Sequence, residues 1–286
     1  MNYVELAIKS NFTFLKGGSH PEEYAHRAIK LGLQSFAITD ENSVSGIVRA
    51  HNELKKIKAS IPRGAGTNFL ETRLIPGTEL NSYEGLAITA LAQNRIGWAN
   101  ICRLLTQGKK KEKKGSCKIT INDILKYGNH IAFILHLPKK INSNEWLKLS
   151  KKIVNQFPKT ALILSPQYDG EDFELFLKTA KLAKTLNIQL VASACPIMHH
   201  SKRRRVVDVL SAIRNNCTID NLGYLAERNA ERRIRGPNEL KIIFADYQDA
   251  LINSASIANS CTFSLDELNH QYPSEIYGEE TPNSKL

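Results

Sequence analysis

The sequence lacks the cysteine patterns of a disulfide-rich protein or a zinc ribbon. Its 286 residues include five cysteines, an odd number, and no two of them stand in a Cys-x-x-Cys spacing. An odd count argues against a disulfide framework, and the missing pair spacing argues against a zinc ribbon. This cysteine usage favours a reducing compartment, so we expect a cytoplasmic protein.

We also expect neither a signal peptide nor a membrane span. The chain begins Met-Asn-Tyr-Val-Glu, without the basic stretch and apolar run of a signal peptide. No apolar run approaches the roughly 20 residues that a helix needs to cross a bilayer. We therefore expect no membrane partner.

Common catalytic and nucleotide-binding motifs are absent as well. The sequence contains no GxSxG elbow, no GxxxxGK[ST] loop and no GxGxxG turn. Gly17-Gly18 indicates only a turn. Cys195 could serve as a nucleophile, but nothing nearby in the sequence activates it, and a buried small apolar residue needs no further role.

Basic residues, by contrast, are in excess. Lysine and arginine number 39 against 28 acidic residues, a formal charge of +11. The excess favours a polyanion such as nucleic acid, or less often an anionic membrane, although a solvated lysine-rich surface explains it equally well. The densest run, 109–115, is predicted to be a solvated loop, with phosphate contact as the alternative. The candidate nucleic-acid contacts are Lys109, Lys110, Lys111, Lys113, Lys114, Arg203, Arg204 and Arg205.

The hydrophobic pattern alternates between strand and helix through the first 200 residues. Repeated strand–helix units predict a parallel sheet or barrel with helices outside. Strands are predicted at 3–8, 35–39, 86–91, 131–135, 161–164 and 189–193, and helices at 19–31, 43–56, 98–105, 144–156 and 173–186. Beyond residue 200 only helices are predicted, at 206–215, 239–245 and 249–260. We therefore divide the chain into a barrel core (1–200), a helical part (201–270) and a polar linker or tail (271–286).

Polar side chains follow several of the predicted strands. Reactive groups in such folds lie at the C-terminal ends of strands, where carboxylates, histidines and a thiol could build a hydrolytic metal centre. The candidates are Asp40, Glu79, His136, Cys195, His199 and His200. We expect the three histidines to face solvent, and Asp40, Glu79 and Cys195 to converge at one rim.

Seven ordered motifs point to one family. The first half carries ELAIKSNFTFL at 5–15 with GGSHPEE at 17–23, TDENS at 39–43, GTEL at 77–80 and CRLLTQG at 102–108. The second half carries ASACPIMH at 192–199, AERR at 230–233 and FSLDEL at 263–268. Each motif is weak alone, but the ordered set resembles the N-terminal PHP (polymerase and histidinol phosphatase) domain of bacterial error-prone DNA polymerases of the polymerase III alpha type. The resemblance covers roughly residues 3–282.

The resemblance implies an α/β fold, a distorted (βα)7 PHP barrel with additional C-terminal helices. In active members it also implies a cluster of up to three metal ions. The family's ligand positions fall on Ala7, Lys9, Asp40, Glu41, Glu79, Cys195 and Ile197. Only Asp40 and Glu79 keep the expected ligand type. Because a metal centre needs most of its ligands and an ordered second shell, the resemblance implies a degenerate site, with no metal, cofactor-binding or catalytic residues intact.

The leading hypothesis is a non-catalytic PHP domain, or a fragment containing one, of an error-prone translesion DNA polymerase. Its role would be to support a polymerase domain that is missing or separately encoded, with DNA and accessory translesion proteins as further partners. One alternative is a metal-dependent phosphoesterase or 3'-5' exonuclease. Another is a stand-alone basic nucleic-acid-binding module.

Lys9 leads to a more specific hypothesis. Without metal ions, Asp40 and Glu79 would repel each other, and a lysine at a former ligand position supplies a fixed cation. We expect the Lys9 ammonium to lie within hydrogen-bonding range of one of these two carboxylates. The alternative is that Lys9 extends to water and leaves the carboxylates hydrated.

Overall fold

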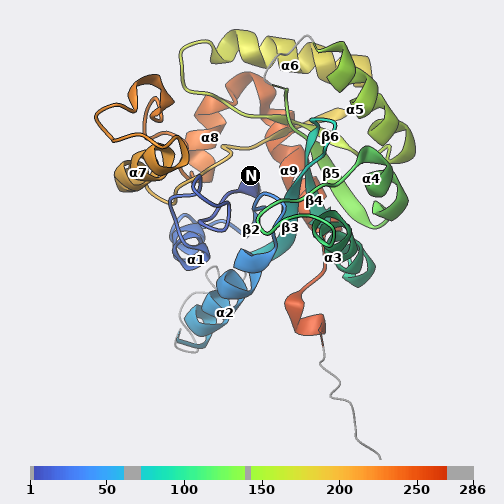
Figure 1. The fold of residues 1–286 in the computed structure, drawn as a ribbon, viewed down its shortest axis with the longest axis horizontal. Helices are drawn as coiled ribbons and strands as arrows, with labels where there is room; N and C mark the ends of the chain where they lie inside the picture. Colours follow the sequence, from blue (N-terminus) through green and yellow to red (C-terminus); the bar gives the residue numbers. More distant parts are fainter. Residues whose placement is uncertain (1–2, 61–71, 139–142, 269–286) are drawn as a thin grey trace, which may run out of the picture.

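A single curled sheet of seven strands organises the molecule (Figure 1). The computed structural model describes residues 3–60, 72–138 and 143–268, so the predicted tail at 271–286 lies outside the described residues. The strands pair in sequence order from β1 to β7. They are β1 (Glu5–Ile8), β2 (Ser35–Ile38), β3 (Arg73–Asn81), β4 (Ala87–Ala92), β5 (Ile131–Leu135), β6 (Ala161–Leu164) and β7 (Gln189–Ala192).

The expectation of an all-parallel sheet is wrong at β4. This strand pairs antiparallel with both β3 and β5, whereas the remaining neighbours are parallel. The link between β3 and β4 runs only from residue 82 to 86 and contains Gly85, at φ +90°. Such a link is too short for a crossover helix, so it must form a hairpin. β3 was not among the predicted strands, and Glu79 lies within it rather than after its end.

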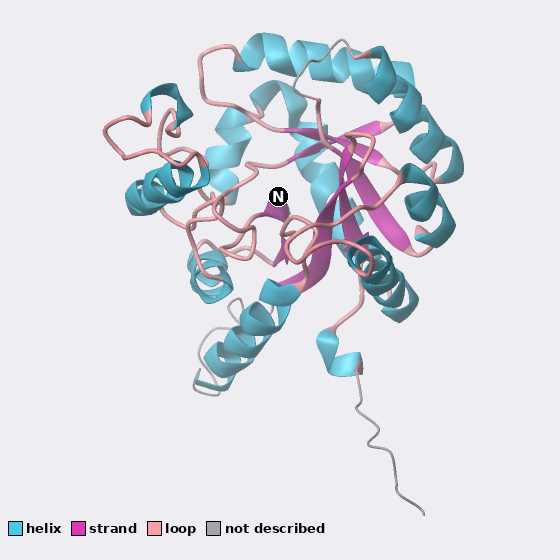
Figure 2. Ribbon diagram, viewed as in Figure 1, coloured by secondary structure: helices cyan, strands magenta, loops and turns pink. Residues whose placement is uncertain are grey.

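Helices cover the outside of the sheet (Figure 2). Those of the first 200 residues are α1 (Pro21–Lys30), α2 (Ser45–Ser60), α3 (Arg95–Lys109), α4 (Ile121–Tyr127), α5 (Asn144–Gln156) and α6 (Asp172–Leu186). They are followed by α7 (Arg204–Arg214), α8 (Pro237–Ile243) and α9 (Gln248–Ser260). α4 is the one α-helix in the described part that we did not predict. No described helix is long and apolar enough to cross a membrane.

The inside of the curl is filled by small and branched apolar side chains. One buried cluster takes residues from every strand of the sheet and adds side chains of α9, which packs against β7 and β1. Its members include Leu6, Ala37, Ile75, Leu91, Ile134, Ile163, Val191 and Ala258. Along most strands, alternation turns the neighbouring residues toward the outer helices, as expected for a barrel-like α/β fold; in β1, Leu6 and Ala7 both join the inner cluster. The predicted barrel-like α/β architecture with additional C-terminal helices is confirmed. The domain division at residue 200 stays a prediction.

A buried carboxylate bridges the two edge strands. Among the described residues no ladder joins β1 to β7, but Glu5 of β1 lies fully buried between them. It accepts hydrogen bonds from the Ala194 N–H at 3.0 Å, the Ala7 N–H at 3.1 Å, the Tyr3 hydroxyl at 2.6 Å and the Ser193 hydroxyl. Burial raises the pKa of Glu5, against these hydrogen bonds. Glu5 thus joins the first and last strands at the point where backbone pairing is missing.

Candidate functional site

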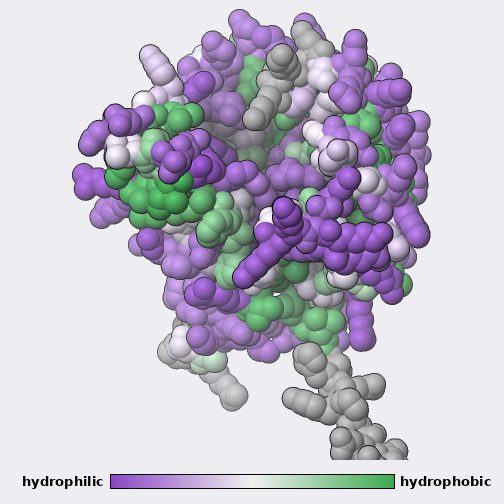
Figure 3. All heavy atoms as spheres, viewed as in Figure 1, coloured by the Kyte–Doolittle hydropathy of each residue, from purple (hydrophilic) through white to green (hydrophobic). Residues whose placement is uncertain are grey.

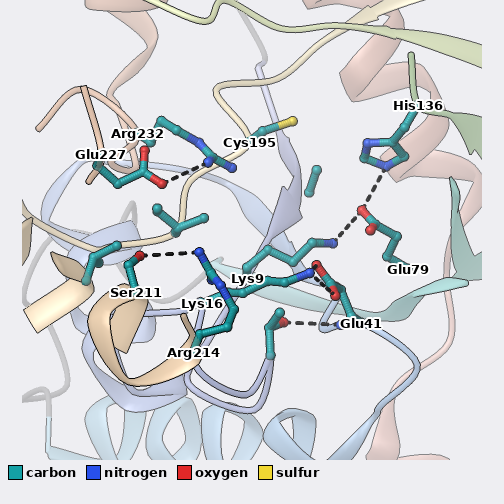
Figure 4. Close-up of a pocket in the computed structure, with 14 residues that line it drawn as sticks. Lys9, Lys16, Glu41, Glu79, His136, Cys195, Ser211, Arg214, Glu227 and Arg232 are labelled. Atoms are coloured by element: carbon teal, nitrogen blue, oxygen red, sulfur yellow. Dashed lines mark hydrogen bonds and ion pairs between the residues drawn. The ribbon is translucent and has the colours of Figure 1, made fainter. Parts of the chain in front are cut away.

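A cavity of about 420 Å³ opens at the edge of the sheet where the strands other than β4 end (Figure 4). Six of the seven family ligand positions line it, and Asp40 is the exception. The six are Ala7, Lys9, Glu41, Glu79, Cys195 and Ile197. The expected convergence of Glu79 and Cys195 is therefore confirmed. Asp40 lies next to the cavity without its carboxylate lining it.

The Lys9 side chain occupies the floor of this cavity as an ion pair. Its Nζ lies 2.8 Å from Oε2 of Glu79 and also donates to the Thr39 carbonyl. Both side chains of the pair are only 10% exposed. The hypothesis of a replacement cation is confirmed in its geometry, with Glu79 as the partner, and the alternative of a solvent-directed Lys9 is wrong.

Asp40 is held by a turn rather than by a cation. One of its carboxylate oxygens accepts from the Ser10 N–H and the Thr13 hydroxyl, and the other accepts from the Ser10 hydroxyl, each at 2.7 Å. Burial raises the pKa of Asp40, and these hydrogen bonds oppose that rise. The expected repulsion between the Asp40 and Glu79 carboxylates is thus avoided, because both oxygens of Asp40 accept hydrogen bonds from residues 10–13.

Glu41, at the family's histidine position, forms an ion pair at the cavity wall. Both of its carboxylate oxygens lie within 2.7 Å of the Lys16 Nζ. The Lys16 side chain is 45% exposed, so this pair is far better hydrated than that of Lys9. The three acidic residues of the former ligand set therefore each have a separate partner.

His136 lines the cavity, so the expectation that it faces solvent is wrong. Its Nε2 lies 2.8 Å from the Thr89 hydroxyl and 3.3 Å from Oε2 of Glu79. Burial lowers the pKa of His136 in spite of the nearby Glu79 carboxylate, so the imidazole is neutral at pH 7. Lys9 is consequently the cation that balances Glu79 at neutral pH. His199 and His200 lie outside the cavity lining.

Cys195 has the geometry of a structural residue. Its backbone adopts φ +44°, a left-handed conformation that is uncommon for residues other than glycine. Burial raises the pKa of its thiol, so the thiolate that a nucleophile needs is disfavoured. The structure gives no support to a nucleophilic role.

Charged residues that we did not predict for the site complete the cavity wall. Arg232 lies 3.4 Å from Glu227, and Arg214 of α7 donates to the Leu15 carbonyl at 2.9 Å. Arg232 stands in the AERR motif, which was a usable signal. Arg214 and Glu227 belong to no motif, because their place depends on how the chain after β7 folds back.

The donor atoms present do not fit a multi-metal centre. The side chains of Ala7 and Ile197 have no atom that can bind a metal, and Lys9 brings a positive charge. Both carboxylate oxygens of Asp40 already accept hydrogen bonds from Ser10 and Thr13. In the described part of the chain, no group of three or more His, Cys, Asp or Glu residues is arranged to hold a metal ion. A cation entering the cavity would have to compete with the Lys9 ammonium for Glu79.

The pH dependence of stability provides a test of the pair. Burial raises the pKa of Glu79, but the charge and hydrogen bond of Lys9, together with smaller contributions from His136 and Lys16, outweigh it and lower the pKa from 4.5 to about 2. Because the folded-state pKa is the lower one, ionised Glu79 stabilises the fold above about pH 4.5, by about 3 kcal/mol, and this contribution is lost as the pH falls toward 2. We expect Glu79→Gln to flatten the stability profile between these pH values, measured by urea unfolding. An unchanged slope would contradict the assignment.

Comparison with known proteins identifies the family. Residues 5–171 match the family described as "PHP domain". The chain belongs to the PHP domain family. An error-prone DNA polymerase of Ruegeria pomeroyi is 34% identical over 312 residues, a match that covers 100% of this chain and 28% of that protein. Error-prone DNA polymerase 1 of Rhizobium meliloti is 34% identical over 287 residues, covering 99% of this chain and 25% of that protein.

The PHP chain thus spans about a quarter of the length of these curated relatives. Among solved structures, an amidohydrolase from Chromobacterium violaceum is similar, with a TM-score of 0.45 and 11% identity. That match covers 68% of this chain and 88% of the amidohydrolase. The sequence matches establish a PHP domain homologous to error-prone DNA polymerases.

Proposed function

We propose that this chain is a non-catalytic PHP domain that supports the polymerase part of an error-prone DNA polymerase. The observation that carries the proposal is the buried Lys9–Glu79 ion pair in the cavity where the family's ligand positions meet. An ammonium group bound to the best remaining ligand opposes a second cation at the same place. The chain would then contribute to translesion synthesis, and so to DNA repair and replication in the cytoplasm, through its fold rather than through hydrolysis.

An exposed apolar surface favours a supporting role. It is formed by side chains of α7 and of residues 219–225, and Figure 3 shows apolar colour gathered over this part of the molecule. The members, each at least 38% exposed, are Val206, Val209, Ile213, Ile219, Tyr224 and Leu225. Contiguous apolar surface of this kind marks an interaction site on a soluble protein. In the relatives about three quarters of the length lies outside the matched part, and we propose that this polymerase part covers the surface.

The arrangement of α7 connects this surface with the cavity. One face of the helix presents Val207, Ser211 and Arg214 to the cavity, and the opposite face carries the exposed apolar residues. A polymerase part bound to the outer face would therefore press α7 over the former metal site. Accessory translesion proteins are the further partners of the proposal.

An activity assay tests the non-catalytic assignment. We expect the chain, purified without chelator and supplied with Mn²⁺, Zn²⁺ or Fe²⁺, to hydrolyse neither a chromogenic phosphodiester nor the 3' end of a labelled oligonucleotide above the blank rate. The physical reason is that five of the seven ligand positions no longer carry the expected ligand. Of the two that do, Glu79 is bound by the Lys9 ammonium in an ion pair.

The matched control is Glu79→Ala, which removes the ligand-type residue that remains in the cavity. Hydrolysis by the wild-type chain that disappears in this variant would overturn the proposal. Hydrolysis that persists in the variant comes from a contaminating enzyme and leaves the assignment in place.

A further inference from the structure

Three separate segments bring positive charge together around His200. Lys202 lies two residues after His200 and donates its N–H to the imidazole Nδ1 at 3.1 Å. Arg233 lies beside the same segment through a β-bridge to Met198. The third segment is α1, whose Tyr24 ring lies 6.5 Å from that of His199, itself 6.2 Å from the His200 ring.

The basic residues of α1 follow Tyr24 toward the C-terminal end of the helix. Arg27 is three residues on and neighbours Tyr24, and Lys30 is three residues beyond Arg27, turned about 120° from Tyr24 toward solvent. Burial, together with the charges of Arg27, Lys202, Arg233 and Lys30, lowers the pKa of His200. The contacts of their own segments place Lys202 and Arg233 beside His200, and α1 brings Arg27 and Lys30 to the neighbouring His199.

The acidic residues of this region are already paired. Glu23 forms an ion pair with Arg203 and lies 3.7 Å from His199. Glu239 pairs with Arg233, and Glu231 with Arg235. Arg27, Lys30 and Lys202 form no ion pair with a carboxylate in the described ranges, and the buried Nε of Arg27 has no hydrogen-bond partner there. Three positive charges thus remain uncompensated on one surface.

We propose that Arg27, Lys30 and Lys202 form a binding site for the phosphodiester backbone of a nucleic acid. Several cations held on separate rigid elements match a ligand that carries a negative charge at each repeat. The choice of nucleic acid over other polyanions rests on the proposed function, because the relatives are DNA polymerases. The site differs from those predicted at 109–114 and 203–205. In the second of these, Arg203 and Arg204 are engaged with Glu23 and Asp208.

Fluorescence anisotropy of the full chain with labelled DNA tests the site. The probes are a single strand of about 30 nucleotides and a duplex of about 30 base pairs, each titrated across a salt series that starts near 50 mM. We expect the triple variant Arg27→Gln/Lys30→Gln/Lys202→Gln to bind at least about tenfold more weakly at the lowest salt. For the duplex, the slope of log K against log salt should shrink by about 3.

Two variants with the same loss of charge serve as comparisons. Lys148→Gln/Lys151→Gln/Lys152→Gln changes exposed lysines of α5 and should alter the affinity less than about twofold. Lys109→Gln/Lys111→Gln/Lys114→Gln tests the basic run, and we expect it to weaken binding less than the α1 triple variant does. Melting temperatures establish that all three variants are folded.

Three outcomes would overturn the proposal. Equal loss in the α5 variant would mean that only net charge matters, and greater loss in the 109–114 variant would place the site there. Binding to phosphatidylserine vesicles without binding to either DNA would identify a membrane surface instead. Because the assay measures no hydrolysis, its failure would leave the non-catalytic assignment of the cavity standing.

Discussion

Replacing Glu5 with alanine is expected to destabilise the fold by about 3–5 kcal/mol. The carboxylate accepts hydrogen bonds from two backbone N–H groups and two hydroxyls at the junction of β1 and β7. Its removal leaves these buried donors without an acceptor, and the two edge strands lose their link. Urea unfolding at pH 7 measures the change in the free energy of unfolding.

Glu5→Gln is the matched control for this change. The amide keeps one oxygen as an acceptor and fills the same volume, but its NH₂ group faces donors, so we expect an intermediate loss. A loss below about 1 kcal/mol in Glu5→Ala would mean that the backbone alone holds the two edges together.

Replacing Lys9 with alanine is expected to cost about 3 kcal/mol, because the ionised Glu79 carboxylate then stays buried without a counter-charge. The control is Lys16→Ala, which breaks the neighbouring pair with Glu41. The Lys16 side chain is 45% exposed, so water solvates both charges and the expected loss is below about 1 kcal/mol. Thermal and urea unfolding report both variants. Equal effects for the two lysines would show that burial of the Lys9 pair adds nothing.

Much of the fold could be predicted because local patterns determine it. The apolar segments of β2, β5 and β6 are short, fully or almost fully buried, and followed by amphipathic helices, and each lies where the hydrophobic pattern places it. The antiparallel direction of β4 was missed. The signal for it was the short link with Gly85, which has no room for a crossover helix.

The sequence predicted which residues form the site more readily than it predicted the contacts between them. Motif positions placed Lys9 and Glu79 in one cavity, and charge balance predicted that Lys9 pairs with Asp40 or Glu79; the structure selects Glu79. Sequence could not show that Asp40 turns to Ser10 and Thr13, because those hydrogen bonds depend on how residues 10–13 fold over the strand end. Nor could it place Arg214 of α7 against Leu15, a contact between residues nearly 200 positions apart.

The central claim is that Lys9 supplies to Glu79 the positive charge that metal ions supply in active PHP domains. A double-mutant cycle with Lys9→Met and Glu79→Gln tests it most directly, by urea unfolding at pH 7. We predict that the double variant is more stable than Lys9→Met alone, with a coupling energy of at least about 2 kcal/mol, because it removes both buried charges together. Strictly additive losses would contradict the claim.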